Sequence, residues 1–321
     1  MIMKLLEVEN LNVSFLVDNE KVHVINDVSF DINENEVLAV IGETGCGKSV
    51  MGSAVLRLLP ENAVVSGNIY YKNTDILNMP ENDFRLMRGK EIASVPQSPS
   101  TSLDPLMKVG DQVAECVTIG NHIAPKEKNG LRSRVDSIFS KLKLPRNEEM
   151  YDNYPCELSG GMRQRILLSM GIITSPELLI VDEPTKAIDW VLRKDIVREL
   201  KALKDEMKCA MLFITHDLSA ASIIADRIAV MYSGEIVETG PTKEVLNNPK
   251  HPYTKGLIAA MPSRGLNVME GYMPSFSEVF DTCRFLPRCP EKKHICDKEI
   301  PCFAEINILH KVKCHLYNGG V

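Results

Sequence analysis

The sequence has no uninterrupted apolar stretch that approaches the roughly 18 residues needed for a membrane-spanning helix. Its N-terminus, Met1-Ile2-Met3-Lys4, runs directly into strand-like sequence and lacks the basic segment, apolar segment and cleavage site of a secretion signal. An excess of positive charge is also missing, because 37 Lys and Arg stand against 43 Asp and Glu, a net charge of −6. We therefore expect a chain that stays in the cytoplasm and has no general affinity for nucleic acid.

What the chain does have is the composition of a globular protein, with 321 residues, 44% hydrophobic and 25% charged. That length favours about two domains. Alternating apolar and polar residues over 5–32 predict antiparallel strands, and the segment of about 98–157 predicts helices between Pro-rich turns. A strand and helix rhythm returns after it, with buried strands predicted at 178–181 and 210–214.

One loop has the pattern G-x-x-x-x-G-K-[ST] of phosphate-binding loops. It follows the apolar run 37–41 and opens a predicted helix at 49–59, which is the context that such a loop requires. Glycines let backbone N–H groups curl around an anion, and the helix N-terminus adds the positive end of its dipole. We expect Lys48 to contact the β- and γ-phosphates and the Ser49 hydroxyl to bind Mg²⁺. The loop consists of Gly42, Glu43, Thr44, Gly45, Cys46, Gly47, Lys48 and Ser49.

Two acids follow a second apolar strand and complete the hydrolytic half of the predicted site. Asp182 ends the run Leu178-Leu179-Ile180-Val181 and can hold the Mg²⁺ shell. Glu183 is next to it and can polarise an attacking water. Two acids at a strand end are common on their own. Their occurrence in the same chain as the phosphate-binding loop favours a role in hydrolysis.

A third motif, Leu158-Ser159-Gly160-Gly161-Met162, resembles the LSGGQ signature of ABC-transporter ATPase subunits, with Met162 in the last position. Helical spacing of the apolar residues after it puts Ser159, Gly160 and Gly161 at a helix N-terminus, a second anion site. The resemblance implies a composite site, in which the signature of one subunit closes over ATP held by another. It also implies an α/β P-loop fold with an antiparallel β subdomain, a parallel-sheet RecA-like core and a helical subdomain.

The other motifs of that family follow in order along the chain. Gln97 is similar to the Q-loop glutamine, which contacts Mg²⁺ and water, and His216 to the switch histidine, which holds the γ-phosphate. Asp189 resembles the D-loop aspartate, and Phe15 is the candidate aromatic for stacking on adenine, with a plain core role as the alternative. Lys186 and Trp190 depart from the family pattern beside the D-loop, but neither change removes a hydrolytic group.

Three further matches resemble the oligopeptide and dipeptide importers within that family. They are Ser102-Leu103-Asp104-Pro105 after the Q-loop, His251-Pro252-Tyr253-Thr254 and the stretch from Cys283 to Pro290. The resemblance implies ATP-driven peptide import, with a second ATPase subunit, two transmembrane permease subunits and an external solute-binding protein as partners, at the cytoplasmic face of the membrane. An importer of another solute such as nickel, and a non-transport ABC ATPase, remain alternatives.

The cysteines are unevenly distributed, since five of the nine lie within the last 39 residues (283–321). In a cytosolic chain such crowding indicates a metal site more than disulfides. Structural zinc sites usually contain C-x2-C pairs, which are missing, whereas four thiolates suit a [4Fe–4S] cluster. The peptide-importer resemblance implies the same cluster on Cys283, Cys289, Cys296 and Cys314. Zinc and free thiols are the alternatives, and Cys302 is either a bystander or the fourth ligand in place of Cys314.

The expected division of the chain is an ATPase domain over 1–246 and a C-terminal extension over 247–321. The extension contains seven prolines and little periodicity, and we expect a bound metal to hold it in shape.

Overall fold

The computed structural model describes residues 3–18, 20–120, 130–145, 149–186, 190–278 and 281–317. The chain forms two compact units. The first unit contains Met1–Leu5, Asn33–Glu36 and Asn78–Phe213, and the second contains Leu6–Ile32, Val37–Leu77 and Ile214–Val321. No helix in the described part of the chain is both long enough and apolar enough to cross a bilayer.

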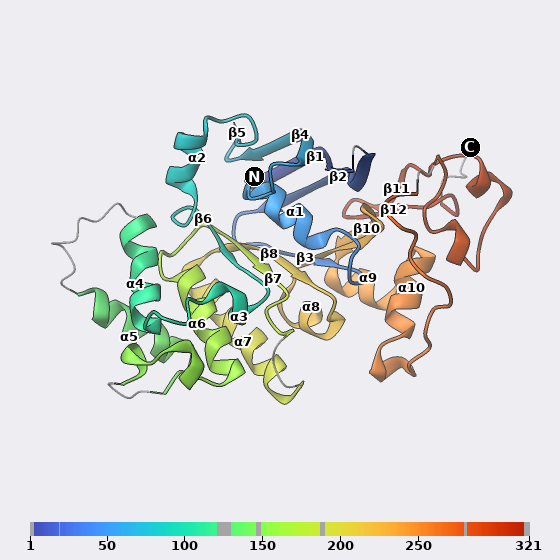
Figure 1. Ribbon diagram of the computed structural model, residues 1–321. Coiled ribbons are helices and arrows are strands. Elements are labelled where there is room, and N and C mark those ends of the chain that lie inside the picture. The colour runs from blue at the N-terminus through green and yellow to red at the C-terminus, as the bar shows by residue number, and fades with distance from the viewer. Residues whose placement is uncertain are drawn as a thin grey trace. The chain divides into compact units, whose positions relative to one another are not determined.

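The first unit is built from a parallel sheet and a group of helices (Figure 1). Its strands are β6 (Ile92–Val95), β7 (Leu178–Asp182) and most of β8 (Ala210–Thr215), and its helices are α2 (Glu81–Met87), α3 (Pro99–Ser102), α4 (Val109–Gly120), α5 (Leu131–Lys141), α6 (Gly160–Ile172) and α7 (Trp190–Met207). Short 3-10 turns cover Met150–Asp152 and Pro155–Glu157. Helices α3, α4 and α5 contact α6, and α6 packs on β6, so the sheet and helices share one core.

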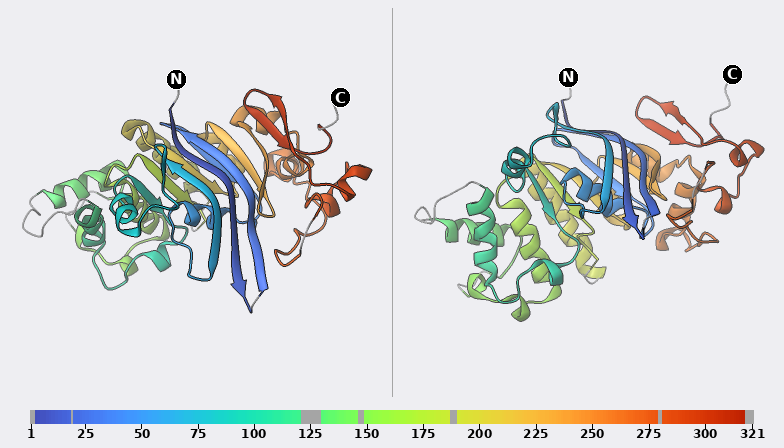
Figure 2. Two further views of the ribbon diagram at one scale, coloured as in Figure 1. Left: turned by 90° about the horizontal axis from the view of Figure 1, so that it is seen from above. Right: turned by 45° about the horizontal axis from the view of Figure 1, so that its top comes forward.

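The second unit contains two sheets. The first has the strand order β2-β1-β4-β5, and Figure 2 shows its two longest strands, β1 and β2, side by side. The strands of the second are neighbours in the order β11-β12-β10-β9-β3. The strand bounds are β1 (Lys4–Val17), β2 (Glu20–Asn33), β3 (Val37–Ile41), β4 (Ala63–Tyr71), β5 (Thr74–Asp75), β9 (Arg227–Tyr232), β10 (Glu235–Pro241), β11 (Phe303–Asn307) and β12 (His310–Lys313).

The helices of the second unit are α1 (Lys48–Val55), α8 (Leu218–Ile224), α9 (Thr242–Asn247) and α10 (Pro252–Ala259). Three 3-10 turns lie in the extension, at Pro262–Arg264, Leu286–Arg288 and His294–Asp297. β3 is parallel to β9, and all five residues of β3 are buried. A fully buried parallel strand needs apolar side chains on both faces, which explains the run Val37-Leu38-Ala39-Val40-Ile41.

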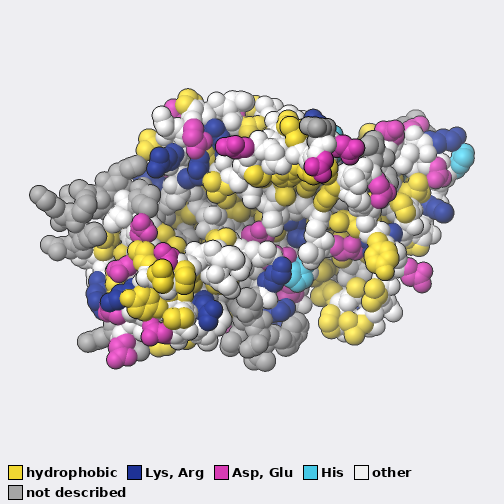
Figure 3. Space-filling view, in the orientation of Figure 1, with side chains coloured by type: hydrophobic (Ala, Val, Ile, Leu, Met, Phe, Trp, Pro, Cys, Tyr) yellow, Lys and Arg dark blue, Asp and Glu magenta, His cyan; other side chains and the backbone are white. Residues whose placement is uncertain are grey.

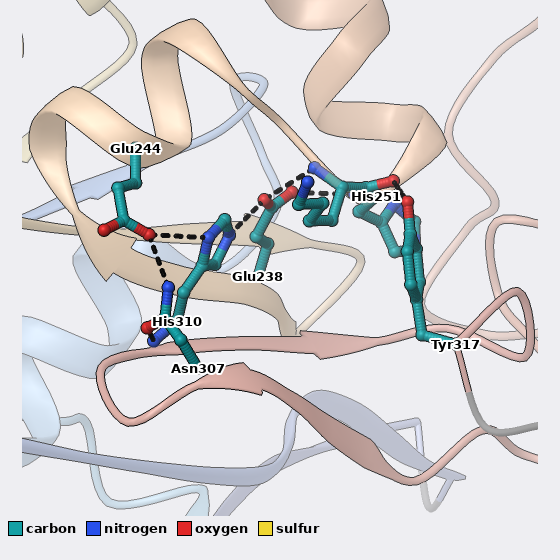
Figure 4. Close-up of polar contacts among 7 residues, drawn as sticks. Glu238, Glu244, His251, Asn307, His310 and Tyr317 are labelled. Carbon is teal, nitrogen blue, oxygen red and sulfur yellow. Dashed lines mark hydrogen bonds and ion pairs between the residues drawn. The ribbon is translucent and has the colours of Figure 1, made fainter. Parts of the chain in front are cut away.

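The extension contributes strands to the second sheet, which its weak periodicity did not predict. The hairpin β11–β12 is antiparallel, and β12 pairs with β10 through Glu238↔Val312. The buried Glu238 carboxylate accepts hydrogen bonds from the His251 backbone N–H and from His310 Nε2, both at 2.8 Å (Figure 4). His310 Nδ1 also lies 3.4 Å from Glu244. These bonds join polar groups of β10, α9, α10 and the hairpin, and they hold the hairpin β11–β12 against this sheet.

Candidate nucleotide-binding site

The predicted phosphate-binding loop joins β3 to α1 in the second unit, as its sequence context required. Gly42 passes so close to the Met231 carbonyl that an added Cβ would lie 2.2 Å from its oxygen. Gly47 caps α1 with a φ of 106°, in the left-handed region that favours glycine. The glycines of this motif are therefore required by close packing and by backbone conformation.

Lys48 is the centre of the loop's polar contacts. Its side chain is buried, and Nζ donates hydrogen bonds of 2.8 Å to the carbonyls of both Gly42 and Glu43. Nζ also lies 3.8 Å from the Cys46 thiol, whose pKa is raised by burial. The chain thus holds one cation inside a loop whose Thr44 and Gly45 are exposed, and a cation so placed can bind phosphate oxygens.

Glu43 has every polar group engaged within the second unit. Its N–H donates to the Tyr253 hydroxyl at 3.0 Å, and its carbonyl accepts from Lys48. Its carboxylate accepts two hydrogen bonds of 3.0 Å, one from each terminal nitrogen of Arg288. Sequence reasoning missed Tyr253 and Arg288, which come from α10 and from the 3-10 turn at Leu286–Arg288.

The remaining predicted residues of the second unit lie at the ends of strands and helices. Ser49 is exposed in the first turn of α1, and His216 is exposed directly after β8. Asp217 follows it and caps α8, accepting from the N–H groups of Ser219 and Ala220. Phe15 is half-buried on β1 opposite Ala63, so its ring is partly available for stacking.

The first unit brings together the predicted residues that follow its parallel strands. β6 and β7 pair in parallel, with Val95 opposite Val181. Gln97 follows Val95 by two residues and Glu183 follows Val181 by two residues, so both lie beyond the same end of the sheet. Asp182 and Gln97 are half-buried, and Glu183 is buried. Glu183 has a φ of 47°, a left-handed conformation that costs a non-glycine residue roughly 1–2 kcal/mol. Strain of this kind is concentrated at functional sites.

The signature forms the N-terminus of α6 in the first unit. Ser159 is the N-cap, and its hydroxyl accepts from the Met162 N–H at 3.3 Å. Ser159 and Gly160 are exposed and Gly161 is half-buried. The helix start therefore presents backbone N–H groups outward, which is the arrangement that binds anions.

The D-loop segment 187–189, which contains Asp189, lies outside the described residues, and Lys186 and Trp190 flank it. Lys186 is exposed. Trp190 begins α7.

The four cysteines predicted to hold a metal lie in the extension, where Cys296 and Cys314 are buried and Cys283 and Cys289 are half-buried. Burial, with a smaller contribution from the nearby thiols of Cys296, Cys314 and Cys289, raises the pKa of Cys283 to about 11. Cys302 is exposed. In the described part of the chain, no group of three or more His, Cys, Asp or Glu side chains is placed to hold a metal ion. The four thiols therefore share one neighbourhood and do not form a ligand set here.

Two family models match the chain in the order that the motifs suggested. The ABC transporter model matches residues 25–186, and the model for the C-terminal region of oligopeptide/dipeptide transporters matches residues 237–296. The second match includes the helix α10 and Cys283, Cys289 and Cys296.

Curated relatives align over most of the chain or nearly all of it. The dipeptide transport ATP-binding protein DppD of Bacillus subtilis is 37% identical over 98% of this chain and 95% of its own length. The oligopeptide transport ATP-binding protein OppD of the same organism is 39% identical over 81% of this chain and 72% of its length.

Solved structures confirm the fold. The dimeric ATP-binding cassette MJ0796 has a TM-score of 0.66 and 23% identity, covering 74% of this chain and 98% of its own. CbiO1 from Clostridium perfringens has a TM-score of 0.63 at 26% identity, covering 76% of this chain and 91% of its own. The predicted fold class is thereby confirmed as that of an ABC ATPase cassette. The chain belongs to the ABC transporter family of ATP-binding proteins and has the C-terminal region of its oligopeptide/dipeptide transporters.

Proposed function

We propose that this chain is the ATP-hydrolysing subunit of an importer that moves di- or oligopeptides across the cytoplasmic membrane. The observation that carries the proposal is the match of residues 237–296 to the oligopeptide/dipeptide C-terminal region, beside a cassette with the full set of hydrolytic residues. DppD and OppD, similar over most of the chain, are named for dipeptide and oligopeptide transport. Those names do not favour nickel as cargo.

Each predicted residue has a role in the proposed reaction. Lys48 binds the β- and γ-phosphates, aided by the N–H groups from Gly42 to Ser49, and Phe15 stacks on adenine. Ser49, Gln97 and Asp182 are the residues that would hold Mg²⁺, which neutralises phosphate charge when bound. Glu183 takes a proton from the attacking water, and His216 holds the γ-phosphate. Ser159, Gly160 and Gly161 of a second subunit close over the same nucleotide.

The proposed partners are a second ABC ATPase subunit, two transmembrane permease subunits and, indirectly, a solute-binding protein outside the membrane. Closure of the two ATPases would move the permeases, which contact the helical segment of about 98–157.

Hydrophobic side chains gather around the end of α10 (Figure 3), and the segment beyond it exposes Leu266 (61%), Val268 (81%) and Tyr272 (94%). An apolar surface of this kind suits contact with another chain.

Purification from native membranes tests these partners. An affinity tag on this chain should recover two integral membrane subunits and, where the ATPase pair is heterodimeric, a second ATPase. Recovery of the chain with ribosomes or DNA, and without membrane subunits, would favour a non-transport ABC ATPase and contradict the proposal. The same experiment tests association with the membrane, because the chain should be released only when the permeases are solubilised.

We also propose that Cys283, Cys289, Cys296 and Cys314 hold a [4Fe–4S] cluster, whose contribution would be to fix the extension. Support comes from the chemistry of four cysteine ligands in one extension, and the described structure does not group these thiols as a ligand set. No step of hydrolysis runs through this group. The division of the chain into an ATPase domain over 1–246 and a C-terminal extension over 247–321 belongs to the same proposal.

Protein purified without oxygen should be brown and contain about four irons per chain, with a broad visible absorption band. Replacement of Cys289 by Ser should abolish the band, whereas replacement of Cys302 by Ser, the matched control in the same segment, should leave it unchanged. Stoichiometric zinc without iron would contradict the cluster and support the zinc alternative.

A further inference from the structure

The extension contacts the phosphate-binding loop through one buried arginine. The fork of Arg288 donates to both carboxylate oxygens of Glu43 at 3.0 Å, and its Nε donates to the Glu270 carbonyl at 3.2 Å. The Arg288 side chain is 5% exposed and that of Glu43 is 30% exposed. A planar, two-point contact of this kind fixes the orientation of both side chains, which a surface ion pair does not.

An aromatic cluster holds Arg288 in place. Its guanidinium lies 5.7 Å from the centroid of the Tyr232 ring. Tyr232 contacts Phe285 edge-to-face, with ring centroids 5.2 Å apart, and Tyr253, at 4.6 Å. All three rings are buried. The position of Arg288 is therefore set by packed rings from β9 and from two parts of the extension, α10 and the segment that contains Phe285, and the ion pair is preorganised.

A second contact reaches Glu43 from helix α10. The Tyr253 hydroxyl accepts the Glu43 N–H at 3.0 Å. Tyr253 is placed by His251, the N-cap of α10, whose Nδ1 accepts the Tyr253 N–H at 3.0 Å. Burial lowers the pKa of His251 to about 3, so the ring is neutral and can accept this bond. The sequence His251-Pro252-Tyr253 thus aims one hydroxyl at the loop.

A third contact supports the loop through the turn between β9 and β10. The Gly234 N–H donates to the Cys46 carbonyl at 2.9 Å. Arg284 of the extension donates to the adjacent Ser233 carbonyl at 2.9 Å and pairs with Glu235. Two arginines of one short segment therefore act on the loop, Arg288 directly and Arg284 through this turn.

We propose that the C-terminal extension positions the phosphate-binding loop, and that Arg288 is a positioning residue acting through Glu43 on Lys48. The proposal rests on the function proposed above for the loop. Glu43 connects the two sides, since its carboxylate is held by Arg288 and its carbonyl accepts from Lys48 Nζ. Arg288 also neutralises a carboxylate that would otherwise stand, uncompensated, in a loop that receives an anion.

The test is the affinity of the full-length chain for ATP, measured with a fluorescent ATP analogue. Arg288→Met keeps the length of the side chain and removes its charge, and we expect the Kd for ATP to rise about tenfold. The rise should diminish at high ionic strength, because Glu43 is partly exposed. The control is Lys255→Met, which removes another ion pair of the extension, with Glu291 at 2.8 Å, and should leave Kd unchanged.

The double variant Glu43→Gln/Arg288→Met tests whether Arg288 acts through Glu43. Because the charged contact is already lost in Arg288→Met, the added Glu43→Gln change should weaken ATP binding no further, and the effects of the two substitutions should not add. A double variant whose loss of affinity is the sum of the two single losses, or a Lys255→Met variant as weak as Arg288→Met, would overturn the proposal. An unchanged Kd in Arg288→Met would do so as well.

Tyr253→Phe gives a second route if Arg288→Met fails to fold. It keeps the ring and removes the hydroxyl that accepts the Glu43 N–H, so Kd should rise about threefold to tenfold while kcat at saturating ATP changes less. An unchanged Kd in this variant contradicts the proposal. Wild-type protein that binds no ATP would instead refute the proposed function itself, so the two failures are distinguishable.

Discussion

Replacement of Glu183 by Gln should lower the rate of ATP hydrolysis by about 10²–10⁴-fold, the contribution typical of a general base. Gln has the size of Glu and cannot take the proton from water. Glu183 is buried and has a left-handed backbone, with a φ of 47°, directly after β7. Because Gln has nearly the same shape as Glu, the substitution should remove the proton acceptor without unfolding the strand.

The variant should still bind ATP, because the phosphate-binding loop is unchanged, and it should retain unhydrolysed nucleotide after gel filtration. The matched control is Glu177→Gln, an exposed acid just before the same strand, whose ATPase rate should equal that of the wild type. If Glu183→Gln hydrolyses ATP at the wild-type rate, the assignment of the base is wrong.

Replacement of Lys48 by Met should weaken ATP binding by roughly 10- to 100-fold, since one hydrogen bond to a charged group contributes about 1.5–3 kcal/mol. Met fills the space of the buried stem and removes the ammonium that bonds the carbonyls of Gly42 and Glu43 at 2.8 Å. Equilibrium binding of a fluorescent ATP analogue measures the change.

Lys243→Met, an exposed lysine on α9 in the same unit, is the control and should bind ATP normally. Circular dichroism should show the same helix content for both variants. Wild-type affinity in Lys48→Met would mean that the loop does not contact phosphate through this side chain.

The parts of the cassette that could be predicted from sequence are those in which local pattern and burial agree. The strand at 37–41, its loop and the helix after it follow from one apolar run, the glycines and Lys48, and Ser159 was expected at a helix start and caps α6. Helix α1 ends at Val55, earlier than the apolar periodicity indicated, and Arg57 just after it has a φ of 53°.

The contacts of the extension could not be predicted, because they join residues far apart in the chain. Arg288 and Glu43 are separated by 245 residues, and nothing local at either position indicates the other. The hairpin β11–β12 forms because β10 offers an edge to pair with, a tertiary cause that a single segment does not contain. The sequence therefore located Tyr253 and Arg288 inside recognisable motifs and gave no sign of what they contact.

ATP-driven peptide import by this chain is tested most directly by uptake of a labelled peptide into proteoliposomes that contain the complex purified through this chain. ATP is supplied on the side of the ATPase and the solute-binding protein on the other side. We expect peptide uptake that depends on ATP and stops in the Glu183→Gln complex, and no ATP-dependent uptake of nickel. ATP hydrolysis without peptide uptake, or equal uptake by the Glu183→Gln complex, would contradict ATP-driven peptide import.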